Sequence, residues 1–168
     1  MKYIGIDIGD GESAVACLAE DSVIEPVIQP IDGRGSILSV VGMAGTEVRI
    51  GEKALLDRKV VHLRSRFKSR YLNTMDAERD IERFSHGLRT ALLEEADDFF
   101  DGDVYIAVGC PAGWKENDRA RYCEIMKRAG LGDVHIVSES RAAFFYARYA
   151  HELKVAPELL DQTTLVID

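Results

Sequence analysis

The stretch Lys2-Tyr3-Ile4-Gly5-Ile6-Asp7-Ile8-Gly9-Asp10-Gly11 opens the chain and decides how the remaining sequence is interpreted. Its first six residues alternate like a β-strand, with Tyr3 on the face opposite the two isoleucines. Residues 8–11 then predict a tight hairpin turn. Residues 13–19 and 23–28 also have the character of strands. We therefore expect the chain to begin with an antiparallel meander of three strands.

Helical and strand patterns alternate farther along the chain. Apolar residues at three- and four-residue steps predict a long amphipathic helix over residues 76–100. The continuous apolar run at 104–109 is typical of a central strand that is covered on both faces. The elements expected after it are a helix capped by Asn117 or Asp118, a strand at 134–137, a helix capped by Ser138 and a strand from 164. This order predicts an α/β fold, with a mixed five-stranded sheet and helices on both faces.

Residues 31–73 interrupt this alternation and predict a small inserted subdomain. Short strands are expected at 36–43 and 48–50, and a short helix at 52–59. The basic run 58–70 is expected to be a surface loop in the most mobile part of the molecule.

The last residues, 165–168, repeat the pattern of residues 4–7: an apolar strand that ends in an aspartate. A buried strand seldom ends a chain so abruptly. We therefore expect the sequence to be the first part of a longer protein.

Composition limits the classes of protein that fit. The chain has 168 residues, is 46% hydrophobic and 30% charged, and so can form the packed core of one domain. Its net charge of -8 argues against a general nucleic-acid binder. Apolar runs are too short for a membrane span, and no signal peptide is visible. Three scattered cysteines are too few for a disulfide framework, which favours a reducing cytoplasm.

The turn after the first strand carries the sharpest chemical signal. Glycines at such a turn let backbone N–H groups approach a phosphate. Asp7, just before the turn, is placed to hold Mg²⁺, which keeps several waters and takes one or two carboxylates. Taken alone, the pattern is more often a plain hairpin turn.

Motifs in the same order along almost the whole chain give this turn a context. The chain resembles the N-terminal ATPase lobe of the heat-shock protein 70 (DnaK-like) chaperones, within the actin, hexokinase and chaperone ATPase superfamily. The segments that carry the resemblance are 3–9, 35–41, 50–54, 104–114, 117–131, 136–143 and 165–168. The resemblance implies a ribonuclease-H-like core, with residues 1–168 forming one lobe and the second lobe lying outside this sequence.

The resemblance also implies ATP or ADP and Mg²⁺ as ligands, and a set of site residues. The metal would be held near Asp7 and Asp168, and Glu139 would help to order the metal-bound or attacking water. The phosphates would be cradled by the backbone N–H groups of Gly9, Asp10 and Gly11.

A catalytic lysine of these chaperones has no obvious counterpart. Arg64 is the nearest placement, with Arg66 and Lys68 as rivals, and an arginine is not equivalent to a lysine there. The chaperones have two threonines where this chain has Asp10 and Gly11, and a carboxylate facing a triphosphate is repulsive unless a metal or an outward rotamer relieves it. The turn at 109–114 looks closer to plasmid-segregating actin-like proteins.

Three functions are therefore compared. The first is an ATP-binding lobe of a chaperone-like ATPase, inactive alone, whose full-length parent hydrolyses ATP and meets unfolded clients or co-chaperones through other regions. The second is a ribonuclease-H-type nuclease or junction resolvase, with Asp7, Glu139 and Asp168 as a two-metal cluster. The third is an actin-like filament protein. The net charge of -8 and the glycine turn after Asp7 count against the second.

Overall fold

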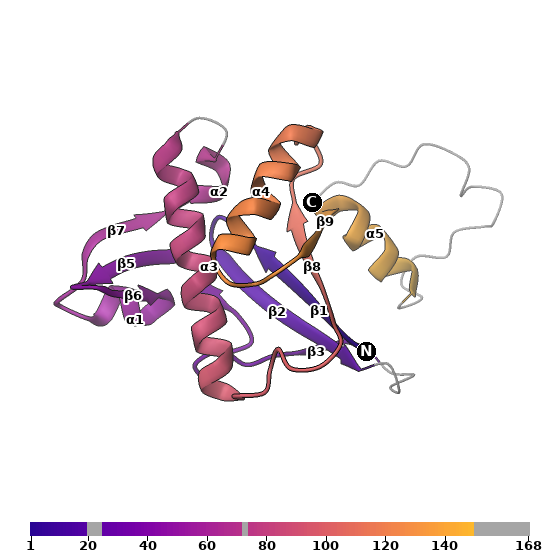
Figure 1. Cartoon of the computed structure of the whole chain (residues 1–168), viewed down its shortest axis with the longest axis horizontal. Helices are drawn as coiled ribbons and strands as arrows, with labels where there is room; N and C mark the ends of the chain where they lie inside the picture. Colours follow the sequence, from indigo (N-terminus) through magenta and orange to yellow (C-terminus); the bar gives the residue numbers. More distant parts are fainter. Residues whose placement is uncertain (20–24, 72–73, 150–168) are drawn as a thin grey trace.

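The hairpin expected at the start of the chain forms the centre of the larger of two sheets (Figure 1). The computed structural model describes residues 1–19, 25–71 and 74–149. Strand β1 (Lys2–Ile8) pairs antiparallel with β2 (Glu12–Ala19), which pairs in turn with β3 (Val27–Ile28) and β4 (Ile37–Leu38). On its other side β1 pairs parallel with β8 (Val104–Cys110), and β8 with β9 (Val134–Ser138).

The predicted mixed sheet is therefore confirmed, with two corrections. The strand order is β3-β2-β1-β8-β9, and β4 adds a sixth strand by pairing with β2. The predicted third strand, 23–28, is described only at Val27–Ile28, and the strand expected from residue 164 lies outside the described residues.

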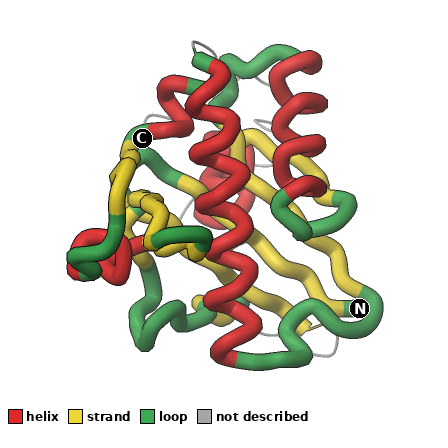
Figure 2. The backbone as a smooth tube through the Cα atoms, turned by 60° about the vertical axis from the view of Figure 1, so that its left-hand side comes forward, coloured by secondary structure: helices red, strands yellow, loops and turns green. Residues whose placement is uncertain are grey.

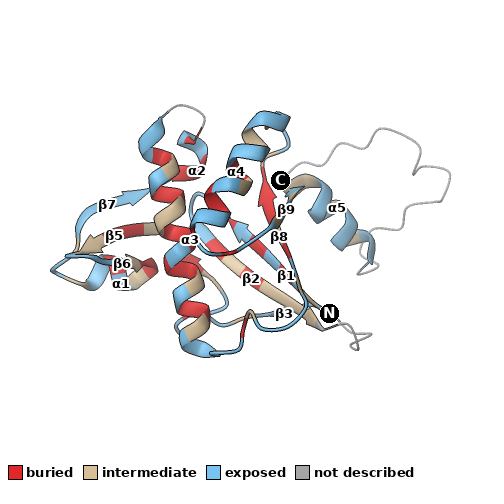
Figure 3. Ribbon diagram, viewed as in Figure 1, coloured by how far each residue is buried: buried red, intermediate tan, exposed pale blue. Residues whose placement is uncertain are grey.

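Two helices cover one face of this sheet. α3 (Met75–Glu95) and α4 (Glu116–Arg128) lie side by side over the strands, as Figure 2 shows. The alternation of β1 turns Ile4, Ile6 and Ile8 toward these helices, and all three are buried (Figure 3). No helix in the described parts of the chain is long and apolar enough to span a membrane.

The boundaries of both helices differ from the predicted ones. The stop at residue 100 was wrong because α3 ends at Glu95 and the acidic stretch after it forms turns. α4 starts at Glu116 rather than after a capping Asn117 or Asp118. The Asp118 carboxylate instead reaches back and accepts a hydrogen bond of 3.0 Å from the N–H of Lys115, which satisfies one free donor at the helix start.

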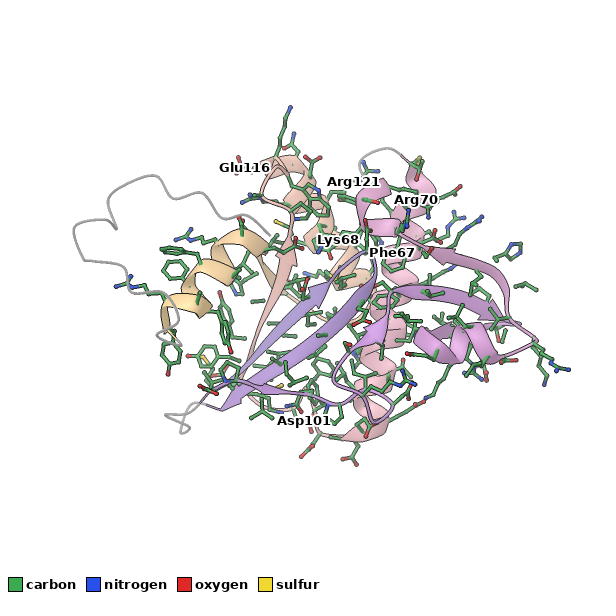
Figure 4. The ribbon with its side chains drawn as sticks, turned by 180° about the vertical axis from the view of Figure 1, so that it is seen from behind. Phe67, Lys68, Arg70, Asp101, Glu116 and Arg121 are labelled. Atoms are coloured by element: carbon green, nitrogen blue, oxygen red, sulfur yellow. The ribbon has the colours of Figure 1, made fainter. Side chains whose placement is uncertain are left out.

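α5 (Glu139–Tyr149) follows β9 directly and contacts β8 and β9. Its first residue packs against Gly109, which alternates with the buried Val108 and so belongs to the opposite face of the sheet. Helices therefore lie on both faces, although Figure 4 shows β1 and β2 uncovered when the molecule is viewed from behind.

The insertion contains a second, three-stranded sheet. Its order is β6 (Glu47–Ile50), β5 (Val40–Ala44), β7 (Val61–Ser65), with α1 (Gly51–Leu56) after β6 and α2 (Phe67–Arg70) after β7. The single strand expected at 36–43 is split at Ser39 between the two sheets. The helix expected at 52–59 is shorter than predicted, and the basic run 58–70 is not a loop.

Candidate functional site

Two carboxylates meet across Gly109 at the carboxyl ends of the central strands. Asp7 is near the end of β1, and Glu139 follows the end of β9. A Cβ atom on Gly109 would lie 3.5 Å from Asp7 Oδ1 and 3.5 Å from Glu139 Oε1, so these two oxygens lie within twice that distance of each other. The same Cβ would lie 3.1 Å from Glu139 Cγ, so the absence of a side chain at Gly109 leaves room for both.

The glycine turn joins the same edge from the other side of Asp7. Gly9 N–H donates to the carbonyl of Glu12 at 3.0 Å, and a Cβ on Gly9 would lie 2.5 Å from that oxygen, so the turn requires glycine there. Gly11 has nothing within 4 Å of its Cβ position, and its carbonyl accepts from Ser39 N–H at 2.8 Å. The turn is thus fixed by hydrogen bonds on both sides.

The side chain of Asp10 points toward the insertion. Its Oδ1 accepts a hydrogen bond of 3.0 Å from the backbone N–H of Ser69 in α2. An aspartate in this turn would repel a bound phosphate. The hydrogen bond from Ser69 turns the Asp10 carboxylate toward α2 and so reduces the repulsion.

Lys68, labelled beside Phe67 in Figure 4, is the cation that the fold brings to Glu139. Its Nζ donates to Glu139 Oε1, and its side chain is 5% exposed against 37% for Glu139. Arg64, which the sequence favoured, lies on the exposed strand β7, and Arg66 is exposed at the start of α2. The structure thus places Lys68, and neither arginine, against Glu139.

Aromatic packing explains why a lysine on a one-turn helix is buried. The ring of Phe67 packs at a tilt against that of Phe84 on α3, with centroids 5.1 Å apart, and the ring of Tyr71 packs on Trp114 with centroids 4.7 Å apart. These two aromatic residues flank Lys68 and hold α2 against the larger domain. Trp114 is buried in this cluster, as expected for a packing residue.

The groups beneath the site are held in their neutral forms. Burial raises the pKa of Tyr71 to about 12. Burial raises the pKa of Tyr122 well above its usual value, and the nearby carboxylates Glu139 and Asp7 raise it further. Burial also raises the pKa of the Cys110 thiol, although Arg119 opposes this.

The donor set fits a hydrated divalent cation. Mg²⁺ accepts one or two carboxylates and keeps its remaining ligands as water, and Asp7 supplies one carboxylate at this edge. Glu139, the neighbouring carboxylate, is already paired with Lys68. The described residues contain no group of three acidic, histidine or cysteine side chains suited to bind a metal directly. Asp168, the other predicted metal-side residue, lies outside the described residues.

Sequence reasoning missed two features of the site. One is the Asp10–Ser69 hydrogen bond, which joins residues 59 positions apart and leaves no local pattern. The other is the preference for Lys68, for which a signal existed: Phe67 and Tyr71 stand four residues apart, the spacing of one buried helical face.

No known protein-family profile matches the chain. A curated protein, the chaperone protein DnaK of Thermosipho melanesiensis, is 27% identical over 149 residues. The match covers 83% of this chain and 25% of that protein, so the chain spans about a quarter of its length. This level of similarity supports a distant relationship to DnaK-type chaperones.

Proposed function

We propose that the chain is the nucleotide-binding lobe of a heat-shock-70-like chaperone or a related ATPase, built on a ribonuclease-H-like core. The carrying observation is that the glycine turn, Asp7 and the Lys68–Glu139 pair share one edge of the sheet, where ligands of open α/β sheets bind. The similarity to DnaK supports the same assignment.

In this proposal the turn and the carboxylates divide the work of binding. Backbone N–H groups of Asp10 and Gly11 cradle the phosphates. The Gly9 N–H, expected to join them, instead donates to the Glu12 carbonyl. Asp7 and Asp168 would hold Mg²⁺, which keeps several of its waters. When bound, Mg²⁺ neutralises phosphate charge, and this is how phosphoryl transfer by such sites is accelerated.

In the proposed reaction Glu139 orients the attacking water and Lys68 offsets the negative charge of the phosphates. Glu139, beside Asp7, orients a water molecule for attack on the terminal phosphate of ATP. Lys68 offers a compact ammonium whose donors can turn from Glu139 toward phosphate oxygens. Catalysis of this type depends on positioning, and α2 is packed to hold Lys68 in place.

The ion pair also weighs against the nuclease alternative. A two-metal nuclease needs its carboxylates to coordinate cations, whereas Glu139 is paired with Lys68. A phosphate-binding site gains from the same lysine. The described residues offer no comparable observation in favour of a filament.

We further propose that nucleotide lies in a cleft between this lobe and a second one, in a cytoplasmic protein whose clients or co-chaperones bind elsewhere. One wall leaves the phosphates in water, where each charge contact is weak. We therefore expect the 168-residue chain to bind Mg·ADP or Mg·ATP weakly and to show no hydrolysis above background.

The test is an NMR titration of this chain with millimolar Mg·ADP and Mg·ATP. Shift changes centred on residues 7–11 and on Lys68 are expected. Lys68→Met should weaken binding, whereas Arg64→Met, which removes a cation from the exposed strand β7, should not. The reverse ranking would favour Arg64 as the catalytic cation. Shifts confined to other surfaces, or metal-dependent cleavage of a branched DNA duplex, would contradict the proposal.

A further inference from the structure

Helix α2 lacks the local cap that a helix start normally has. The first turn of a helix leaves backbone N–H groups without partners, and a serine, threonine, aspartate or asparagine just before the helix usually accepts from one of them. Arg66 occupies that position, with φ of 52°, and makes no side-chain capping bond. An arginine side chain offers hydrogen-bond donors and no acceptor, so Arg66 cannot cap the helix.

The missing acceptor comes from the glycine turn. Ser69 is the third residue of α2, and its N–H donates to Asp10 Oδ1 at 3.0 Å. An aspartate at the helix start would accept from this same N–H in an ordinary cap. Asp10 reaches it from 59 residues away in the sequence.

We infer that Asp10 is a positioning residue: its carboxylate caps α2 from the glycine turn and thereby holds Lys68 against Glu139. The donor of this hydrogen bond is Ser69, the residue after Lys68, and the acceptor is Asp10 in the glycine turn. Movement of the turn is therefore transmitted to the lysine. The part of this inference that concerns ligand binding rests on the proposed function.

The polar contacts of Arg70 join α2 to parts of the molecule other than the glycine turn. Arg70 donates to the carbonyls of Ser65 and Arg66, which closes the connection from β7 into α2. Arg70 also lies 3.7 Å from a carboxylate oxygen of the buried Asp80 on α3. These contacts tie α2 to β7 and α3, whereas Asp10 ties it to the glycine turn.

The first experiment needs no ligand. Amide hydrogen exchange of Ser69 is measured in the 168-residue chain and in Asp10→Ala, Asp10→Asn and Glu12→Ala. Loss of one exposed hydrogen bond should speed exchange of Ser69 about fivefold in Asp10→Ala. Asp10→Asn keeps an acceptor oxygen and should keep the protection. Glu12→Ala removes an equal charge two residues farther along, where the carboxylate accepts a hydrogen bond from Ser36, and should leave Ser69 exchange unchanged.

Unchanged exchange in Asp10→Ala would overturn the inference. Equal acceleration in Asp10→Asn would also overturn it, because the effect would then follow charge rather than the hydrogen bond.

The second experiment tests the coupling to Lys68 with Mg·ADP as the probe. Asp10→Ala should lower affinity about fivefold in the chain that carries Lys68 and should have no further effect in Lys68→Met. Asp10→Asn should recover the affinity that Asp10→Ala loses. An equal loss in both backgrounds would overturn the positioning role. If the unmodified chain binds no nucleotide, the proposed function fails on this chain, while Ser69 exchange still decides whether Asp10 caps α2.

Discussion

Alanine at Gly9 would place a methyl carbon 2.5 Å from the carbonyl oxygen of Glu12. Ordinary carbon–oxygen contacts lie at about 3.3–3.6 Å, so the turn must open by most of an ångström. The oxygen also accepts the 3.0 Å hydrogen bond from Gly9 N–H, so the two cannot both be kept. Overpacking strain of about 1–3 kcal/mol and a lost hydrogen bond of about 1 kcal/mol give an expected loss of about 2–4 kcal/mol.

Gly11 provides the matched control, because its Cβ position has nothing within 4 Å. Neither of the two glycines has a positive φ, so alanine is compatible with the backbone at both. Gly11→Ala should leave stability unchanged or raise it by up to about 1 kcal/mol, because it restricts the unfolded chain.

Urea unfolding of both variants measures the difference. For a chain of this size the loss in Gly9→Ala corresponds to a fall in Tm of roughly 5–15 °C. Equal stability of the two variants would refute the claim that the contact with Glu12, and not a general need for glycine, specifies the turn.

Three other predictions concern single groups. Burial raises the pKa of Tyr71 to about 12, so above about pH 10 the unfolded chain releases a proton that the folded state retains. Stability should therefore fall as pH rises from about 10 to about 12, and fall less in Tyr71→Phe, as thermal melts at each pH would show. Tyr122 carries a buried hydroxyl with no hydrogen-bond partner among the described residues, so Tyr122→Phe should raise unfolding free energy by about 1 kcal/mol, and a clear loss would reveal a partner. Thr74 Oγ1 accepts from Ala77 N–H at the start of α3, so denaturant unfolding should show a loss of about 1 kcal/mol in Thr74→Ala and little change in Thr74→Ser.

Elements with a long, regular period could be predicted from the sequence. The β1–β2 hairpin, the apolar strand β8 and the helices α3 and α4 all formed near their expected places. Each has enough residues for its alternation or its helical stripe to stand out.

Features set by distant contacts could not be predicted in this way. The apolar run around Ser39 gives no sign that Ile37–Leu38 pairs with β2 while Val40–Ala44 joins another sheet. In the structure the Ser39 hydroxyl lies 2.7 Å from that of Ser13, in a buried position, and its N–H bonds to Gly11. These partners exist only once the chain has folded.

The site residues also fall into two groups, those that a local sequence pattern locates and those that distant contacts locate. Asp7 lies near the end of β1 and Glu139 follows the end of β9. Strand ends can be located from the sequence, so the approach of these two residues could be expected. Lys68 could not be separated from Arg64 by charge alone. Its position depends on the packing of Phe67 on Phe84 and of Tyr71 on Trp114, and the four-residue spacing of Phe67 and Tyr71 is the sign of this packing in the sequence.

The parallel pairing of β1 with β8 joins two segments that are synthesised at different times. β1 is among the first segments to be made, yet its register joins Lys2 to Val104 and Ile6 to Val108. At about 5–20 residues per second, roughly 5–20 s separate the emergence of these partners from the ribosome. During that interval Ile4, Ile6 and Ile8 lack β8, and an isolated two-stranded hairpin is marginal in water. The nascent chain therefore carries an apolar strand with one unpaired edge until residue 104 and its neighbours arrive.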